Sequence, residues 1–138
     1  MNTIEKILQK NIYIFCIFIL VTIVLYGHTL DIPWYLDDNH AILENTEIHS
    51  LSPDKILGLL LAPRGLANIS FALNYAWGAD NPYGYHIVNL CIHAINSFLV
   101  FLVMGRLFKQ KTLFVFLGAL LFLVHPVQTQ AVNYIVQR

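Results

Sequence analysis

The amino-acid sequence predicts an all-α membrane protein, a polytopic helical bundle with about three transmembrane helices and a long helical loop after the first. Of its 138 residues, 57% are hydrophobic and 12% are charged. Soluble domains average about 45–50% apolar residues and about 25% charged residues. Apolar runs at 12–30, 87–107 and 113–125 approach the roughly 20 residues that a membrane-crossing helix needs. Seven of the eight acidic residues fall within 31–85, which separates the first two runs. We therefore interpret 1–138 as one membrane domain.

The first apolar run, from Ile12 to Leu30, is long enough for one crossing. Lys6 and Lys10 precede it, as in a signal peptide. A signal peptide has a shorter apolar region of about 7–15 residues, followed by a cleavage site with small residues. We therefore predict that this run stays in the protein as a membrane anchor. Trp34 follows its far end, where aromatic rings favour the membrane interface.

The loop 31–85 contains two predicted short helices. Ser52-Pro53-Asp54 is typical of a helix start, with serine as the N-cap, proline in the first turn and an acid near the positive end of the dipole. Pro63 predicts its end. This helix is too short to cross a bilayer, so we expect it to lie on the membrane surface. A second helical pattern runs from Leu66 to Trp77.

The second apolar run carries polar side chains at helical spacing. His86, Asn89, His93 and Asn96 are three or four residues apart, and Ser97 follows them. Such a stripe in a membrane helix usually faces other helices, not lipid.

The third run, 113–125, is short for a full span, and Pro126 predicts its end unless the helix continues with a kink. An amphipathic pattern resumes from Thr129 to Arg138. Cys16 and Cys91 fall inside apolar runs and show no metal-ligand spacing, so neither a disulfide nor a metal site is predicted.

The distribution of charge predicts the orientation in the membrane. Basic residues gather at 1–10 and 106–111, whereas the loop 31–85 is acidic. The positive-inside rule places both basic segments in the cytoplasm, so the N-terminus of this multi-pass protein is cytoplasmic in an inner (plasma) membrane. Six polar residues of interest then fall on the extracytoplasmic side: Asp37, Asp38, Arg64, His86, His125 and Arg138.

These residue types suit glycosyl transfer from a lipid-linked donor. A carboxylate can take a proton from an attacking hydroxyl. Arginine binds phosphate with a planar fork. A phosphate at the membrane surface indicates a lipid phosphate, and sugars activated on polyprenyl phosphate are donors of that kind. The formal net charge of zero gives no indication of a nucleic-acid partner.

Structural explanations exist for five of these six residues, and the sequence offers none for Arg138. Asp37 and Asp38 can be solvated loop acids, or Asp38 can cap a helix over 39–44. Arg64 can contact lipid headgroups. His86 can pack against other helices, and His125 before Pro126 can mark only a helix end.

Four segments together resemble a known family. They are Tyr35-Leu36-Asp37-Asp38 with Ile42-Leu43-Glu44-Asn45, the segment 64–75 that begins with Arg64, the segment 82–90 with His93 and Asn96, and 125–132. In this order they resemble membrane glycosyltransferases of the C-type superfamily. The similarity is closer to bacterial relatives of the transmembrane, tetratricopeptide-repeat O-mannosyltransferases.

The resemblance implies a polytopic helical bundle whose catalytic base is one of the Asp37–Asp38 pair. Because adjacent side chains point to opposite sides of an extended segment, only one of the two can be the base, and we choose Asp37. The resemblance implies that the donor phosphate is bound by other residues, which we assign as Arg64, His86, His125 and Arg138. Gly65 stands where the family has proline, which predicts a looser turn after Arg64, and Gln130 stands where many members have glutamate.

The family has many more spans and usually a repeat domain. The resemblance therefore implies that 1–138 corresponds to an N-terminal portion whose site later helices complete, and we expect no transfer by this chain alone. An alternative function is a non-catalytic membrane assembly or anchoring module that keeps the fold. A small transporter-like protein is a third possibility if the four similarities are coincidental. The sequence does not identify a cofactor, the sugar or the acceptor.

Overall fold

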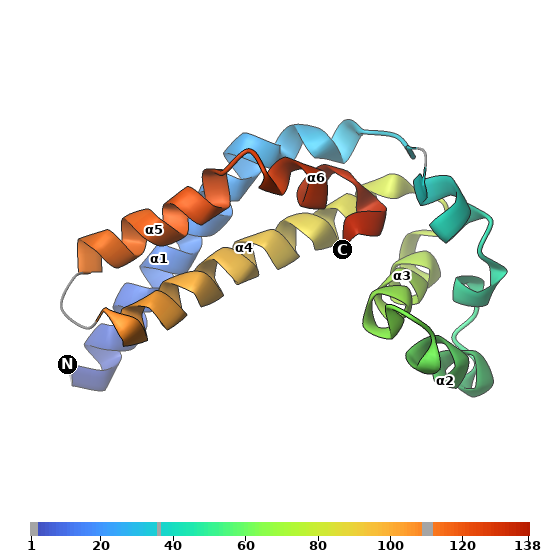
Figure 1. The fold of residues 1–138 in the computed structure, drawn as a ribbon, viewed down its shortest axis with the longest axis horizontal. Helices are drawn as coiled ribbons and strands as arrows, with labels where there is room; N and C mark the ends of the chain where they lie inside the picture. The colour runs from blue at the N-terminus through green and yellow to red at the C-terminus, as the bar shows by residue number, and fades with distance from the viewer. Residues whose placement is uncertain (1–2, 36, 109–111) are drawn as a thin grey trace. The chain divides into compact units, whose positions relative to one another are not determined.

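The computed structural model describes residues 3–35, 37–108 and 112–138, and this part of the chain is helical without any strand (Figure 1). The all-α prediction is therefore confirmed. The longer helices are α1 (Thr3–Tyr26), α2 (Pro53–Leu61), α3 (Gly65–Gly78), α4 (Pro82–Leu107), α5 (Thr112–Val124) and α6 (Gln128–Asn133). The chain forms two compact units: unit 1 is Met1–His28 with Leu90–Thr129, and unit 2 is Thr29–Asn89 with Gln130–Arg138.

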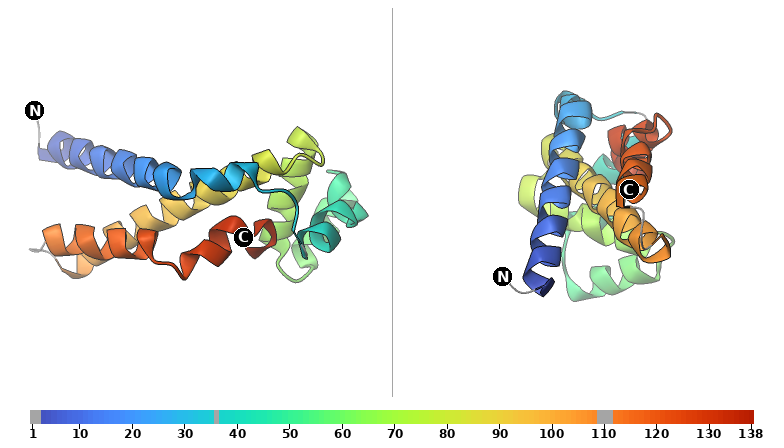
Figure 2. Two further views of the ribbon diagram at one scale, coloured as in Figure 1. Left: turned by 90° about the horizontal axis from the view of Figure 1, so that it is seen from above. Right: turned by 90° about the vertical axis from the view of Figure 1, so that its left-hand side faces the viewer.

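Unit 1 is a bundle in which α1, α5 and the C-terminal part of α4 lie side by side (Figure 2). Val115, Ala119 and Leu123 follow one another at four-residue steps, so they share the face of α5 that packs into the bundle. Phe18 of α1 stacks on Phe116 with ring centroids 5.8 Å apart and meets the edge of Phe101 at 6.2 Å. Aromatic packing therefore joins the three helices.

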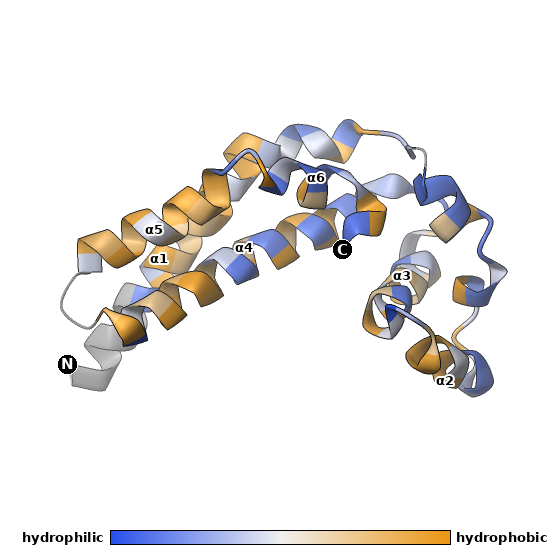
Figure 3. Ribbon diagram, viewed as in Figure 1, coloured by the Kyte–Doolittle hydropathy of each residue, from blue (hydrophilic) through white to orange (hydrophobic). Residues whose placement is uncertain are grey.

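Two helical stretches are long and apolar enough to cross a membrane: Asn11–Asp31 with 21 residues and Pro82–Leu107 with 26. Figure 3 shows the apolar character of α1 and of the C-terminal part of α4. The third predicted span corresponds to α5, which has 13 residues. At 1.5 Å per residue α5 is about 20 Å long, shorter than the roughly 30 Å hydrocarbon core, so a third crossing stays a prediction.

The polar stripe of α4 is buried at His86, Asn89, His93 and Ser97, as predicted. In unit 1 the His93 Nε2–H donates to the carbonyl oxygen of Leu123 at 3.0 Å, and the Ser97 hydroxyl donates to the His93 carbonyl at 2.8 Å. Asn96 is exposed, so its predicted place in the buried stripe is wrong. The stripe continues through Ser97, four residues after His93, because that step returns to the same helix face.

Unit 2 surrounds a second apolar core, and the short helical turns η2 (Asn39–Leu43) and η3 (Thr46–His49) contribute to it. The core side chains come from these turns, from α2, α3 and the start of α4, and from the C-terminal turn η4 (Ile135–Gln137); they are Ile42, Ile48, Leu59, Phe71, Ala72, Tyr85 and Ile135. The predicted loop helices are confirmed as α2 and α3. Ser52 occupies the N-cap position of α2 without a side-chain cap hydrogen bond, and Pro53 begins the helix.

The turn between α2 and α3 is closely packed. Arg64 has φ 61°, in the left-handed region that non-glycine residues rarely adopt. A Cβ atom at Gly65 would lie 2.6 Å from the carbonyl oxygen of Leu60 and 2.8 Å from that of Leu59. A proline at position 65 would also carry a Cβ atom, so this path of the backbone requires glycine. The looser turn expected from the comparison with the family stays a prediction.

Helix α5 ends at Val124, a turn follows at 125–127, and α6 begins at Gln128. The end that Pro126 predicts is confirmed, and the helix does not continue through the proline. Of the basic residues that predicted the orientation, Lys109 and Lys111 lie outside the described residues.

Candidate functional site

Asp38 lies inside unit 2 with 1% of its surface exposed. Its Oδ1 atom accepts a hydrogen bond from the backbone N–H of Val136 at 2.8 Å, and its Oδ2 atom accepts one from the N–H of Tyr35 at 3.4 Å. Asp38 occupies the N-cap position of η2 but makes no side-chain cap hydrogen bond. The carboxylate therefore fastens the first loop to the C-terminal segment, instead of capping the following turn.

Asp37 differs from its neighbour because its side chain is exposed. No hydrogen bond or ion pair links the Asp37 carboxylate to any other residue in the described part of the chain. The adjacent acids thus have different surroundings: Asp38 bonds to backbone N–H groups, and Asp37 is exposed without a bond among the described residues.

Arg138 forms the most extensive polar cluster of unit 2. Its Nε–H donates to Asn89 Oδ1 at 2.8 Å, and its Nη1 donates to Ser70 Oγ at 3.0 Å and to Asn74 Oδ1 at 2.8 Å. Its Nη2 donates to the carbonyl oxygen of Tyr85 at 3.0 Å. The guanidinium carbon also lies 4.8 Å from the centroid of the Phe71 ring, a cation–π distance. We call these six residues the Arg138 cluster.

The Arg138 cluster holds the positive charge without an acidic partner among the described residues. Burial lowers the pKa of the Arg138 guanidinium to about 10, and the charge of Tyr85 acts in the opposite direction. The group remains protonated near neutral pH, because that value is well above 7. Four neutral acceptors therefore compensate for the lost hydration of one cation.

Arg64 is exposed, and its Nη2 donates to the carbonyl oxygens of Val136 and Arg138. Its Nε and Nη1 have no acceptor among the described residues. One end of the guanidinium is thus fixed to the C-terminal segment, and the remaining donors are available to an anion.

The two predicted histidines have different environments. His86 is fully buried in unit 2, where its Nε2–H donates to the carbonyl oxygen of Ile32 at 3.0 Å. Its Nδ1 atom has no partner among the described residues. His125 belongs to unit 1, is exposed, and accepts the N–H of Val127 through Nδ1 at 3.2 Å. Unit 2 therefore unites Asp38, Arg64, His86 and Arg138, which come from four separate segments.

The sequence did not indicate which residues accept the hydrogen bonds of Arg138. Ser70 and Asn74 are four residues apart in α3, and Tyr85 and Asn89 are four residues apart in α4. The Ser70 and Asn74 side chains lie on one helix face, and this spacing was a usable signal, whereas Tyr85 accepts through its backbone carbonyl, which side-chain spacing does not indicate. What the sequence did not indicate was their common partner, because Arg138 is 49 residues from Asn89 and 68 from Ser70.

Comparison with known proteins places these features in a family. The chain is 37% identical over 128 residues to "Protein O-mannosyl-transferase Tmtc1" of Drosophila melanogaster, covering 83% of this chain. It is 35% identical over 126 residues to the mouse protein TMTC3 and 33% identical over 127 residues to human TMTC2, covering 82% and 83% of the chain. The chain belongs to the TMTC family of protein O-mannosyl-transferases. The family predicted from the four motif segments is thereby confirmed.

The TMTC relatives are much longer than this chain. The matched region covers 15% of the Drosophila protein, 14% of the mouse protein and 15% of the human protein. No protein-family model and no solved structure matches the chain. Membership of the TMTC family agrees with the two membrane-crossing stretches and supports a membrane location. The bacterial and N-terminal character of the match stays a prediction.

Proposed function

We propose that this chain forms part of a membrane glycosyltransferase that moves a sugar from a polyprenyl-phosphate donor to a hydroxyl of a protein or glycan. The observation that carries the proposal is the contrast between a buried, bonded Asp38 and an exposed Asp37. A reactive carboxylate needs access to substrate and a backbone that holds it in place. The names of the relatives, protein O-mannosyl-transferases, agree with this class of reaction.

In the proposed reaction Asp37 is the general base. Its carboxylate takes the proton of the acceptor hydroxyl while the hydroxyl oxygen bonds to the anomeric carbon of the sugar. The bond between that carbon and the phosphate oxygen breaks, and the polyprenyl phosphate leaves with the electron pair. One base is sufficient, because an anionic phosphate needs no proton to leave.

Arg64 is the proposed ligand of the donor phosphate. Its side chain is exposed, and two of its three guanidinium nitrogens have no acceptor among the described residues. A planar guanidinium can bind phosphate through two parallel hydrogen bonds and offset its negative charge as the lipid leaves.

The other predicted site residues take different places in this proposal. His86 and Arg138 hold the frame of unit 2, because His86 Nε2 and the guanidinium nitrogens of Arg138 bond to protein oxygens. His125 is exposed but belongs to unit 1, so it stays a predicted donor contact that takes no part in the site formed by unit 2. These assignments leave Asp37 and Arg64 as the groups with the most freedom to bind substrate.

The proposed reaction takes place on the extracytoplasmic face of an inner (plasma) membrane, with the N-terminus in the cytoplasm. The distribution of charge supports this orientation, because the segments 1–10 and 106–111 are basic and the loop 31–85 is acidic. Acceptor proteins or glycans would then meet Asp37 on the extracytoplasmic side.

The test is a transfer assay on membranes that contain the intact gene product. Mannose is the sugar in the names of the relatives, so labelled mannosyl-phosphoryl-polyprenol is the donor probe. We expect label in protein or glycan, and we expect Asp37→Asn to reduce transfer by about 10²–10⁴-fold, the usual contribution of a general base. Full transfer by Asp37→Asn, at wild-type protein level, would contradict the role of Asp37.

A non-catalytic assembly or anchoring module is the second candidate. One observation favours this second function. Both oxygens of the Asp38 carboxylate and most N–H groups of Arg138 form hydrogen bonds within the protein, so these groups stabilise the fold and do not contact substrate. Absence of transfer from several lipid-linked sugars, together with unchanged assembly in Asp37→Asn, would support the second candidate over the first.

A further inference from the structure

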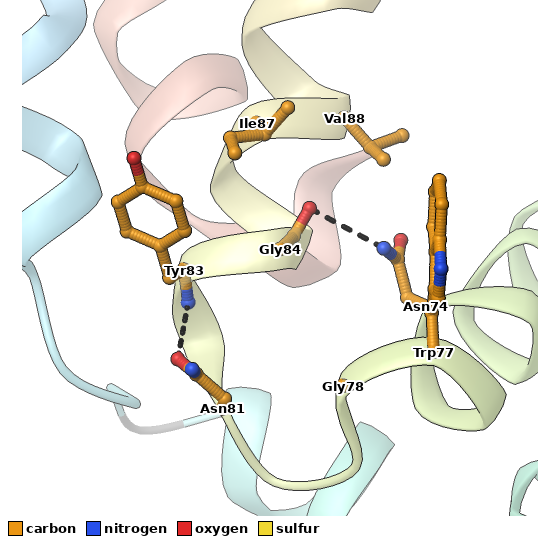
Figure 4. A pocket seen from close by; sticks show the side chains of 8 residues that line it. All are labelled: Asn74, Trp77, Gly78, Asn81, Tyr83, Gly84, Ile87 and Val88. Carbon is orange, nitrogen blue, oxygen red and sulfur yellow. Dashed lines mark hydrogen bonds between the residues drawn. The ribbon is translucent and has the colours of Figure 1, made fainter.

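A pocket lies between the C-terminal part of α3 and the first turns of α4, entirely within unit 2 (Figure 4). Asn74, Trp77 and Gly78 line it from α3, and Tyr83, Ile87 and Val88 line it from α4. Its volume is about 350 Å³, within the range of about 300–1,000 Å³ of ligand pockets. None of the groups assigned to the proposed transfer reaction lines this pocket.

The lining selects an uncharged ligand. It contains no Asp, Glu, Lys, Arg or His side chain, so a phosphate or carboxylate finds no ionic partner there. The Asn74 amide is already used at both ends: Oδ1 accepts from Arg138 at 2.8 Å and Nδ2 donates to the Gly84 carbonyl at 3.3 Å. The Arg138 cluster thus fixes one wall of the pocket.

The position of the pocket indicates where the ligand comes from. One wall is the beginning of the membrane-crossing stretch Pro82–Leu107. Trp77 and Tyr83, which are 90% and 48% exposed, border the pocket. Amphipathic aromatic rings favour the membrane–water interface. A pocket at the end of a span, bordered by such rings and walled by Ile87 and Val88, is therefore accessible to lipid chains.

We propose that this pocket binds the acyl chain of a bilayer phospholipid. A phospholipid is the abundant chain-bearing molecule at this depth, and its headgroup needs no dedicated contact because it stays in the interface. A prenyl phosphate, being scarce, would need a cationic side chain in the lining to select its phosphate, and the lining has none. The bound chain would hold α3 against α4. This role is independent of the proposed transfer reaction.

The test uses phosphatidylcholine with a photoreactive diazirine in its acyl chain, incorporated into nanodiscs with the intact protein. Illumination followed by mass spectrometry should locate the label in 74–88. Gly78→Leu is the blocking variant, because a Cβ atom at Gly78 meets nothing within 4 Å and no glycine among the described residues has positive φ. The added side chain can fill the pocket without backbone strain, so the enrichment of label at 74–88 should be lost.

Gly58→Leu is the matched control, because a Cβ atom added at Gly58 also meets nothing within 4 Å, but Gly58 lies in α2, away from the pocket. It should leave the label in 74–88 unchanged. Trp77→Ala is the second variant: its side chain is 90% exposed, so its loss should not unfold the protein, but it removes one wall and should reduce the label.

Three outcomes would overturn the proposal. One is equal labelling of 74–88 in wild type and in both Gly78→Leu and Trp77→Ala. Another is label spread evenly over exposed apolar side chains without enrichment at the pocket. The third is displacement of the label by a small excess of undecaprenyl phosphate, which would assign the pocket to a prenyl lipid. If the wild-type protein showed no mannosyl transfer but carried the label in 74–88, only the proposed function would be contradicted.

Discussion

The carboxylate of Asp38 accepts the backbone N–H of Val136 at 2.8 Å, although the two residues are 98 positions apart in the chain. Both residues are buried, Asp38 at 1% and Val136 at 7% exposure. This bond attaches the segment after α6 to the first turn of the loop. It also explains why one acid of the adjacent pair is confined while the other is exposed.

Replacing Asp38 by alanine should destabilise unit 2. The buried N–H of Val136 would lose its acceptor, and an unsatisfied buried group costs about 1–3 kcal/mol. We expect Asp38→Ala to lower the melting temperature in detergent, followed by circular dichroism. Asp37→Ala is the matched control, because the exposed Asp37 side chain bonds to no described residue and its loss should leave the melting temperature unchanged. Equal effects of the two substitutions would show that the Asp38–Val136 bond contributes little.

Arg64→Lys should weaken donor binding in the intact gene product. Lysine keeps the charge but loses the planar fork, so we expect the KM for the mannosyl donor to rise by about tenfold. Arg106→Lys is the control, since Arg106 is an exposed arginine in the last turn of α4. If the two variants had the same donor KM as wild type, Arg64 would be a headgroup contact.

Gly65→Ala should destabilise the turn between α2 and α3. The added methyl group would lie 2.6 Å from a backbone carbonyl oxygen, and backbone cannot yield as a flexible side chain can. Gly58→Ala is the opposite case, because Gly58 is exposed in the middle of α2 and an added Cβ atom meets nothing within 4 Å. It should stabilise the helix by about 0.5–1 kcal/mol. Thermal unfolding of both variants checks the signs, and stabilisation by Gly65→Ala would contradict the close packing of this turn.

The proposed orientation predicts which cysteines an impermeant thiol reagent can reach in intact cells. In a background without Cys16 and Cys91, Thr46→Cys should label from outside and Gln110→Cys should not. Thr46 is exposed, whereas the side chain of neighbouring Asn45 caps η3 by accepting the Glu47 N–H, so Thr46 is the better loop position. Gln110 lies outside the described residues. The reverse labelling pattern would place Asp37 and Arg64 in the cytoplasm.

The helical class, the apolar stretches and the two loop helices could be predicted from the sequence. These features depend on composition, on periodicity and on local signals such as Pro53 at a helix start and Pro126 after a helix end. It also identified the family, because four motif segments occur in one order. Helix starts and ends can be predicted because each depends on only a few neighbouring residues.

The contacts of individual polar residues, by contrast, depend on how distant segments pack together. Asp37 and Asp38 are equivalent in the sequence, and their difference arises from Val136, which is far away in the chain. Arg138 and its acceptors in α3 and α4 are likewise joined across 49 or more positions. Which of the two carboxylates is buried depends on where backbone N–H groups from distant segments lie after packing. Local sequence propensities do not predict contacts between segments that are far apart in the chain.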